Sequence, residues 1–253
     1  MTGWLPATLI GLGAGVVSGM FGIGGGIITT PAIRMLLGYP DLIAVGTPLP
    51  VILPTAITGA VVHARQGSAD VRTGLLVGVW GVPAAVAGAA LTRVVGGGAV
   101  LAATAAVIVF VAIDMLLDSD SRHESFERRG GTSWVSAAAV GVTAGFCSGF
   151  LGLGAGFVLV PLLSRVLDME LKRAIGTSLV SVAIFAVPGS ITHWALGHVD
   201  LNLALALTLG VIFGAVAGAR LNHIAAERTI RVFFAVILGI VGILFGLTEA
   251  GVL

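Results

Sequence analysis

The sequence predicts an all-helical protein that crosses a membrane many times and consists of two homologous halves. Of its 253 residues, 57% are hydrophobic and 10% are charged, whereas an ordinary globular chain carries about 25% charged residues. The mean hydropathy is +1.09. Several apolar stretches also reach the roughly 20 residues that a helix needs to cross a bilayer. A glycine-rich motif that occurs twice predicts the two halves.

Eight hydrophobic segments account for most of the chain and predict a multi-pass protein of the plasma membrane. They span 4–37, 42–64, 72–95, 98–117, 134–167, 174–196, 199–221 and 229–248. The net charge of +1 indicates no nucleic-acid partner. The single cysteine, Cys147, cannot form an intramolecular disulfide and is typical of a small packing residue. No cofactor or metal is expected, and the expected partners are the lipid bilayer, a small substrate and, as a further candidate, a second copy of the chain.

The repeated motif reads Gly-x-x-Ser-Gly-x-x-Gly-x-Gly-x-Gly and runs from Gly15 to Gly26, then again from Gly145 to Gly156. A proline follows five residues after each copy. Because glycine costs about 1 kcal/mol relative to alanine inside a helix, this density of glycine predicts a helix break. Bilayer hydrocarbon cannot satisfy the freed backbone groups, so each break must face protein, water or a ligand. The two motifs are therefore the first candidates for a binding site.

The halves align at a constant offset of 130 residues without gaps. The matching residues include Gly11/Gly141, Ser18/Ser148, Gly22/Gly152, Pro31/Pro161, Thr47/Thr177, His63/His193, Asp70/Asp200 and Gly88/Gly218. This register predicts repeat 1 over 1–117, a polar linker over 118–133 and repeat 2 over 134–253.

The distribution of basic residues predicts that the repeats are inverted. If segments 4–37 and 134–167 each enter the membrane and return at their glycines, 11 of the 13 Lys and Arg residues share one side. Only Arg34 and Arg93 then lie opposite. A single crossing by each segment gives a split of 8 to 5 instead. The positive-inside rule favours the uneven split, with both termini outside the cell. Inverted repeats with discontinuous helices are a common transporter plan.

Substrate-binding residues are expected where glycine spacing fits no helical face. Gly11, Gly15 and Gly19 repeat every four residues and are assigned to helix packing. The remaining motif glycines are assigned to an exposed break, where a following helix N-terminus would attract a small anion. Neutral hydroxyls near the breaks are further candidates, with bonding to their own helix carbonyls as the alternative. The predicted binding residues are Ser18, Gly22, Gly24, Gly25, Gly26, Thr47, Ser148, Gly152, Gly154, Gly156, Thr177 and Ser178.

His63 and His193 end their hydrophobic segments at matching positions. One interpretation is a gating or proton-binding residue near each membrane face, because histidine titrates near neutral pH. The alternative is that each ring caps its own helix or lies at the interface. The acidic residues lie in loops or near segment ends, whereas a cation-coupled site usually needs a carboxylate inside the membrane. An anion is therefore the expected substrate.

The duplicated motif, with Gly-Thr at 46–47 and again at 176–177, resembles that of the sulfite exporter TauE/SafE family over nearly the whole chain. The resemblance implies a membrane permease that exports a small sulfur-containing anion such as sulfite, sulfoacetate or thiosulfate. The second copy departs from the pattern, with Ala155 in place of the middle glycine. This departure leaves open whether both copies bind substrate alike.

Two other functions are weighed against secondary anion transport. An intramembrane serine protease would use Ser18 or Ser148, but such proteases typically carry Gly-x-Ser-Gly, and the spacing here is Gly-x-x-Ser-Gly. A catalytic dyad also does not require a symmetric second serine. A non-transporting scaffold does not account for matched glycine breaks in both halves. The sequence therefore favours a transporter over an enzyme.

Overall fold

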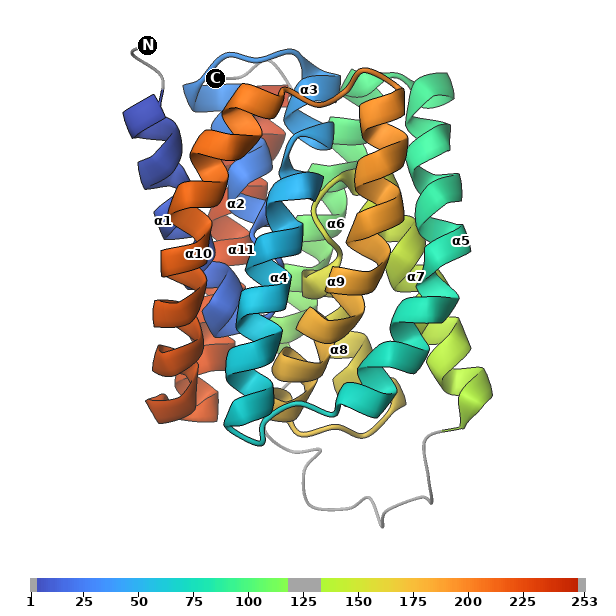
Figure 1. Cartoon of the computed structure of the whole chain (residues 1–253), viewed down its shortest axis with the longest axis vertical. Coiled ribbons are helices and arrows are strands. Elements are labelled where there is room, and N and C mark those ends of the chain that lie inside the picture. The colour runs from blue at the N-terminus through green and yellow to red at the C-terminus, as the bar shows by residue number, and fades with distance from the viewer. Residues whose placement is uncertain (1–3, 118–132, 250–253) are drawn as a thin grey trace.

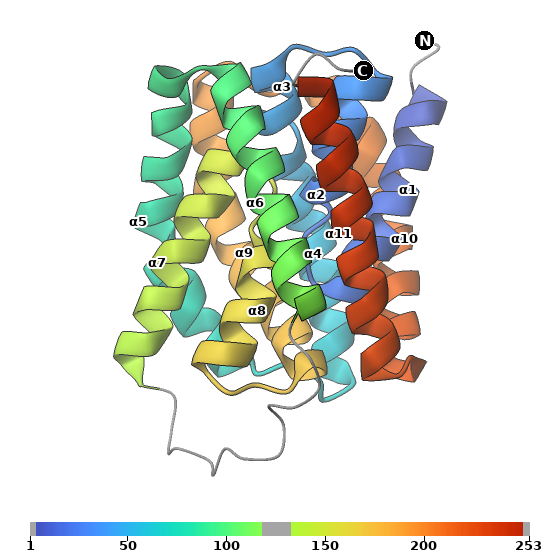
Figure 2. The ribbon, with the colours of Figure 1, turned by 180° about the vertical axis from the view of Figure 1, so that it is seen from behind.

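The computed structural model describes residues 4–117 and 133–249, and these residues form a bundle of helices without strands. The elements are α1 (Trp4–Phe21), α2 (Gly26–Pro31), the π-helical turn η1 (Ala32–Leu36), α3 (Asp41–Gly46), α4 (Pro48–Arg65), α5 (Val71–Val95), α6 (Gly97–Leu117), α7 (Trp134–Leu151), α8 (Gly156–Val166), α9 (Leu171–Ala195), α10 (Leu201–Ile224) and α11 (Glu227–Glu249). Figures 1 and 2 show most of these helices running along the long axis of the bundle.

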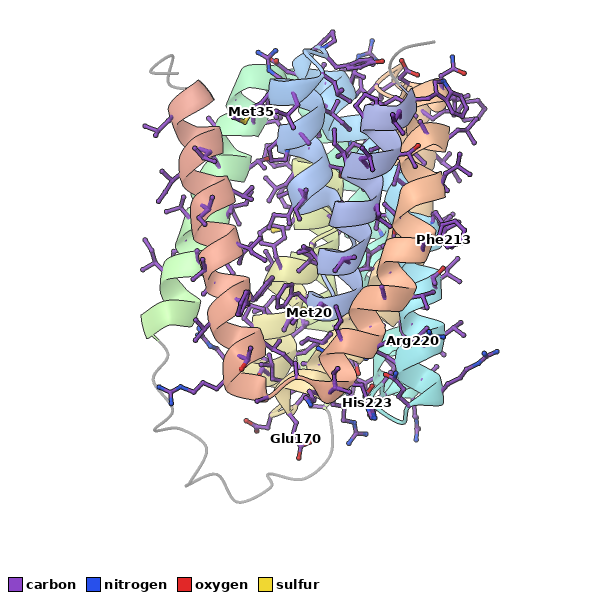
Figure 3. The ribbon with its side chains drawn as sticks, turned by 90° about the vertical axis from the view of Figure 1, so that its left-hand side faces the viewer. Met20, Met35, Glu170, Phe213, Arg220 and His223 are labelled. Carbon is purple, nitrogen blue, oxygen red and sulfur yellow. The ribbon has the colours of Figure 1, made fainter. Side chains whose placement is uncertain are left out.

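Six stretches of the described chain are long and apolar enough to cross a membrane. They are α1, residues 41–65, α5, α7, α9 and α10, and the shorter apolar helices α6 and α8 accompany them. Large apolar side chains cover the outside of the bundle, and Phe213 is 72% exposed midway along α10 (Figure 3). Polar side chains gather at the ends, with Arg220, His223 and Glu170 at the lower end in the same view. This arrangement suits a surrounding bilayer.

Small residues bring helices of the two halves together. Helix α1 packs on α10, and a methyl group added to Gly15 would lie 2.5 Å from the Val211 carbonyl oxygen. Helix α7 packs on α5 in the same way, and a methyl group at Gly145 would lie 2.6 Å from Gly81 Cα. Small residues spaced by four let backbones approach closely. In each pair, the first helix of one half packs on a helix of the other half.

Segments 4–36 and 134–166 are each interrupted at the glycines and turn back. Helix α1 begins at the upper end of the bundle in Figures 1 and 2, and α3, which follows the segment, lies at that same end. Helix α7 begins at the lower end, to which α8 returns. With 18 residues, α1 is about 27 Å long. It therefore penetrates most of a hydrocarbon core that is about 30 Å thick.

The first proline of segment 42–64 lies at the start of α4, whereas Pro54 lies inside that helix. Helix α3 ends at Gly46 and α4 starts at Pro48, where a missing N–H costs nothing because the first amides of a helix have no intrahelical acceptor. Thr47 between them keeps helical backbone angles (φ −62°, ψ −34°), so residues 41–65 form one nearly continuous span. The expected linker 118–133 lies outside the described residues, apart from Ser133. The Ser133 hydroxyl accepts a bond from the Val135 amide and caps α7.

Candidate functional site

Two short breaks interrupt the helices at the glycine motifs. The first break, residues 22–25, separates α1 from α2, and the second break, residues 152–155, separates α7 from α8. Each contains three residues with a positive φ, a conformation that favours glycine. They are Gly22, Gly24 and Gly25 in the first break and Gly152, Gly154 and Ala155 in the second. The backbone path of each break therefore depends on the glycines of the motif.

Ala155 keeps the same backbone conformation as its counterpart Gly25, although it carries a side chain. Its φ is 47°, and that of Gly25 is 84°. A left-handed conformation costs an L-residue about 1–2 kcal/mol. The alanine in the second copy of the motif therefore strains the backbone at Ala155 but does not remove the break.

The two breaks lie against each other and run in opposite directions. A methyl group added to Gly26 would lie 2.5 Å from the Leu153 carbonyl oxygen. At the other end of the contact, a methyl group on Gly156 would collide with the Gly22 carbonyl and lie 2.5 Å from Ile23 Cα. The start of α2 therefore touches the second break, and the start of α8 touches the first. Only glycine at these positions lets the backbones come so close.

Helices α4 and α9 cover the meeting point of the breaks with matching side chains. A methyl group at Gly24 would lie 2.9 Å from Ile52 Cγ2 and 3.2 Å from Val182 Cγ1. A methyl group at Gly154 would lie 2.8 Å from Ile52 Cδ1. Ile52 and Val182 are related by the same offset of 130 residues. The sequence analysis did not single out this pair, because apolar side chains in a membrane helix carry no signal of their own.

Unpaired hydrogen-bond donors gather at the breaks. The hydroxyls of Ser18 and Ser148 are fully buried and have no hydrogen-bond partner. A methyl group on Gly25 would lie 3.6 Å from Ser18 Cβ, which places this serine beside the start of α2. A buried polar group without a partner costs about 1–3 kcal/mol. The two serines are therefore the predicted site residues whose surroundings most favour a ligand.

The starts of α2 and α8 add backbone donors to the two serines. The first amides that bond back into the breaks are Ile28 N, to Gly25 O at 3.2 Å, and Val158 N, to Ala155 O at 3.0 Å. The amides of residues 26–27 and 156–157 precede these bonds and have no acceptor within their own helix. Helix N-termini also carry the positive end of the helix dipole. Two such ends point into the middle of one apolar bundle.

Thr30 is a further candidate that the sequence analysis missed. Its hydroxyl is fully buried on α2 and has no hydrogen-bond partner. The hydroxyl of neighbouring Thr29 bonds to Gly25 O at 3.2 Å. The positions that match Thr29 and Thr30 in the second half are Leu159 and Val160, so the first half offers more hydroxyls. Their position between the glycines and Pro31 was the signal that could have drawn attention to them.

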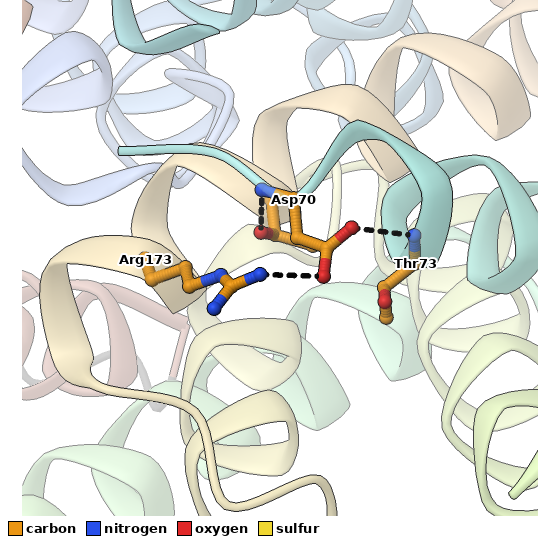
Figure 4. Close-up of polar contacts among 4 residues, drawn as sticks. Asp70, Thr73 and Arg173 are labelled. Atoms are coloured by element: carbon orange, nitrogen blue, oxygen red, sulfur yellow. Dashed lines mark hydrogen bonds and ion pairs between the residues drawn. The ribbon is translucent and has the colours of Figure 1, made fainter. Parts of the chain in front are cut away.

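Thr47 and Thr177 differ from the unpaired serines because their hydroxyls already hold loops. Thr177 Oγ1 accepts a bond from the Asp70 amide at 2.9 Å, and Thr47 Oγ1 accepts one from the Asp200 amide at 3.1 Å. Figure 4 shows Asp70, which also accepts from the Thr73 amide at 3.1 Å and pairs with Arg173 at 2.9 Å. These two threonines therefore tie each half to the first turn of a helix in the other half.

Ser178 contacts the first break directly. Its hydroxyl lies 2.8 Å from both the Gly22 carbonyl oxygen and the Ile175 carbonyl oxygen, so the single O–H proton serves two acceptors. Its counterpart in the first half is Pro48, which has no hydroxyl. Ser178 thus fixes the end of α1, and Pro48 can make no equivalent bond to the second break.

His63 and His193 both bond to the helix that leads into a break. His63 Nε2 lies 3.1 Å from the Gly19 carbonyl oxygen, and His193 Nε2 lies 2.9 Å from that of Gly149. Both rings are fully buried, and neither caps its own helix. A carbonyl oxygen only accepts hydrogen bonds, so each Nε2 carries a proton. Figure 1 shows α4 and α9 ending at opposite ends of the bundle, so the two histidines lie near opposite ends.

The contacts pair neither Ser18 nor Ser148 with a histidine. The two histidine Nε2 atoms bond to glycine carbonyls, and the Ser18 and Ser148 hydroxyls have no partner. A serine protease needs the nucleophile within hydrogen-bond reach of its base. The fold and these breaks define a multi-pass membrane protein with discontinuous helices meeting inside the bundle.

The comparison with known proteins identifies the family. The family model described as Sulfite exporter TauE/SafE matches residues 7–245, so the chain belongs to this family. The probable membrane transporter protein YunE of Bacillus subtilis is 26% identical, with 92% of this chain and 94% of that protein covered. The probable membrane transporter protein MJ0441 of Methanocaldococcus jannaschii is 24% identical, with 93% and 92% covered. No solved structure matches the chain significantly. The protein is thus a membrane transporter and not an enzyme.

Proposed function

We propose that the protein is a secondary transporter that exports a small anion, sulfite or a related organosulfur anion, and binds it where the two breaks meet. One observation carries this proposal: the buried hydroxyls of Ser18 and Ser148 are unpaired, Ser18 lies beside the start of α2, and Ser148 lies one turn before the second break. An anion there would receive hydroxyl and amide donors in place of its hydration shell. Transporters commonly bind anionic groups at the N-termini of half-helices near the middle of the membrane.

The charges of the described side chains also favour an anion. None of the described side chains that are buried in the bundle is a carboxylate, and a buried carboxylate would repel an anion and attract a cation. Export of an anion from a cell with a negative interior is electrically favourable by about 2.3 kcal/mol per charge per 100 mV. Such a carrier therefore needs no coupling cation to drive export.

We further propose that the two halves are inverted repeats that alternate access to this site. The matched contacts support the repeat: His63 bonds to Gly19 as His193 bonds to Gly149, and Thr177 holds Asp70 as Thr47 holds Asp200. Basic residues support the inversion. Arg34 pairs with Asp41 of α3 at the upper end, whereas Arg220 and the pair of Arg173 with Asp70 lie at the lower end. The positive-inside rule then makes the lower end cytoplasmic.

The test measures sulfite efflux from proteoliposomes that contain the purified protein. The variants are Ser18→Ala, Ser148→Ala and the double variant. Ser190→Ala is the matched control, because the Ser190 hydroxyl already bonds to the Ala186 carbonyl of its own helix at 2.6 Å. A hydrogen bond to a charged group contributes about 1.5–3 kcal/mol. Each single variant should therefore raise the KM for sulfite roughly 10-fold or more.

Competition by thiosulfate, sulfoacetate, sulfate and acetate in the same vesicles ranks the anions. Inhibition by the sulfur oxyanions and not by acetate supports the proposed substrate class. A double serine variant with an unchanged KM for sulfite contradicts a site at the breaks. Absence of sulfite flux from the unmodified protein, together with flux of another anion, contradicts the substrate.

A further inference from the structure

His63 and His193 differ in the residue that their Nδ1 atoms contact. His193 contacts a second histidine, which can bind a proton, whereas His63 contacts a serine. In the second half, His193 Nδ1 lies 3.3 Å from His198 Nδ1. His198 belongs to the loop between α9 and α10 and is 7% exposed, whereas His193 is fully buried. The two ring centres are 5.4 Å apart. The matching residue in the first half is Ser68, whose hydroxyl lies 3.0 Å from His63 Nδ1.

The hydrogen bonds determine where the protons of the neutral pair lie. His193 Nε2 carries a proton because it faces the Gly149 carbonyl oxygen at 2.9 Å. A neutral imidazole has one N–H and one acceptor nitrogen, so His193 Nδ1 is the acceptor. His198 Nδ1 must then carry the proton that bridges the two rings. The remaining nitrogen of His198, its Nε2, is left with a free lone pair.

We propose that His193 and His198 form a proton-relay pair that carries one proton from the upper end of the bundle to the last turn of α7, just before the second break. An incoming proton binds His198 Nε2, and the proton on His198 Nδ1 moves to His193 Nδ1. His193 then carries two N–H groups and the positive charge, and His198 is neutral with its acceptor toward His193. The bond between the rings is kept before and after the transfer. A second proton would place N–H against N–H, so the pair holds one proton at a time.

The relay ends next to the unpaired serine of the second half. His193 bonds to Gly149, the residue after Ser148, whose buried hydroxyl has no partner. A proton that reaches His193 therefore places a positive charge against Gly149, which directly follows this serine in the sequence. The inference goes beyond anion transport, because the pair can carry a proton whichever anion the protein moves.

Burial and the charged groups around the pair lower the pH at which it takes up the added proton. The pKa of His198 is lowered from its ordinary value, mainly by burial and also by the charge of Arg93 at the end of α5. On α3, the carboxylate of Asp41 is held by Arg34 at 2.9 Å. Asp200, two residues after His198, accepts from the Leu203 amide at the start of α10. The coupled His193 ring is the remaining titratable neighbour that bonds to His198.

The first half lacks this relay. Ser68 Oγ also lies 3.1 Å from the His63 carbonyl oxygen, so its one proton can point to either acceptor. A hydroxyl does not gain or lose a proton near neutral pH. His63 Nδ1 therefore bonds to a hydroxyl in place of a second titratable ring, and the nearby His223 acts on His63 through its charge alone. Because α4 and α9 end at opposite ends of the bundle, the relay exists at one end only.

The test follows the imidazole nitrogens by NMR in protein labelled with ¹⁵N-histidine and held in nanodiscs. The chain has five histidines, and His193→Asn and His198→Ser assign the pair. As the pH falls below about 6.5, the resonances of His193 and His198 should move together with one midpoint, because burial and the charge of Arg93 lower the pKa of His198. In His198→Ser, which copies the Ser68 arrangement, His193 should stop responding over this range. The control His223→Ser, at an exposed position at the lower end, should leave the pair unchanged.

The reciprocal variant Ser68→His keeps the test decisive if His198→Ser fails to fold. It builds the same pair in the first half, so His63 should gain a pH response that it lacks in the unmodified protein. Separate midpoints for His193 and His198 overturn the relay. So does a His193 response that survives His198→Ser, or a His63 response that is unaffected by Ser68→His. These readouts use no anion, so they are independent of the proposed substrate.

Discussion

Alanine substitutions at two neighbouring glycines should have different consequences, because one glycine is needed for its backbone angle and the other for space. Gly25 has a φ of 84°, but the nearest atoms to an added methyl group are 3.6 Å away. Gly26 has no such angle, but its methyl group would lie 2.5 Å, 2.6 Å and 2.7 Å from the O, C and Cα atoms of Leu153. All three are backbone atoms, which cannot rotate away.

The expected magnitudes follow from these contacts. Gly25→Ala should cost about 1–2 kcal/mol, the cost of a left-handed L-residue. The second break already carries this change as Ala155, with a φ of 47°. Gly26→Ala must separate the breaks by roughly 1 Å to restore an ordinary contact of about 3.5 Å. Such overpacking costs about 1–3 kcal/mol or more, and it also changes the geometry of the proposed site.

Thermal unfolding in detergent and sulfite efflux from proteoliposomes measure the two effects. At about 2–4 °C per kcal/mol, Gly25→Ala should lower the melting temperature by about 2–8 °C and keep transport. Gly26→Ala should lower it at least as much and lose transport. Gly25→Leu should insert normally but block flux, because its bulk lies beside Ser18. Gly13→Ala is the control, since it lies on α1 with nothing within 4 Å of an added methyl group.

Two results would refute this reasoning. If Gly26→Ala matches the unmodified protein in both melting temperature and flux, the two breaks do not abut as described. A Gly25→Ala variant that is less stable than Gly26→Ala would contradict the inference that Gly25 is needed for its backbone angle and Gly26 for the close approach of the breaks.

Two further predictions concern topology and pH. In a Cys147→Ala background, Gly197→Cys should react with an impermeant maleimide from outside the cell, and Gly67→Cys only after permeabilisation; both sites have open surroundings and similar φ values of 75° and 70°. Labelling of both from the same side would contradict the inverted repeats. Burial alone would raise the pKa of Asp70, but the Thr73 amide and Arg173 outweigh it and lower the pKa. The stability that Asp70 contributes is thus present above its unfolded pKa of about 4 and lost as the pH falls through the lower folded value. Asp70→Asn should cost about 1 kcal/mol at neutral pH, and the difference should vanish in acid; a pH-independent difference contradicts the charge effect.

The sequence by itself determined the class of the protein and the location of its breaks. The length and composition of the apolar segments predict membrane-spanning helices, because each helix that crosses the bilayer needs about 20 mainly apolar residues. The glycines at 22–26 and 152–156 predict breaks because glycine alone adopts positive φ without cost. The offset of 130 residues also predicts that matched residues make matched contacts, as His63 and His193 do. These are local or pairwise properties that a linear pattern can carry.

Only the tertiary structure decided which residues meet at the breaks. Ser18, Thr47 and Thr177 all carry a hydroxyl within a hydrophobic segment, so the sequence does not distinguish them. In the structure, the Ser18 hydroxyl is unpaired, whereas the two threonine hydroxyls accept bonds from distant loop amides. Thr30 and the Ile52–Val182 pair are candidates only because the folded structure leaves the Thr30 hydroxyl buried without a partner and places Ile52 and Val182 against the breaks. His198 likewise gains its significance from His193, across a loop. A hydroxyl or a ring nitrogen has the same chemistry everywhere in the sequence, and its role depends on the partner that packing between the two halves places beside it.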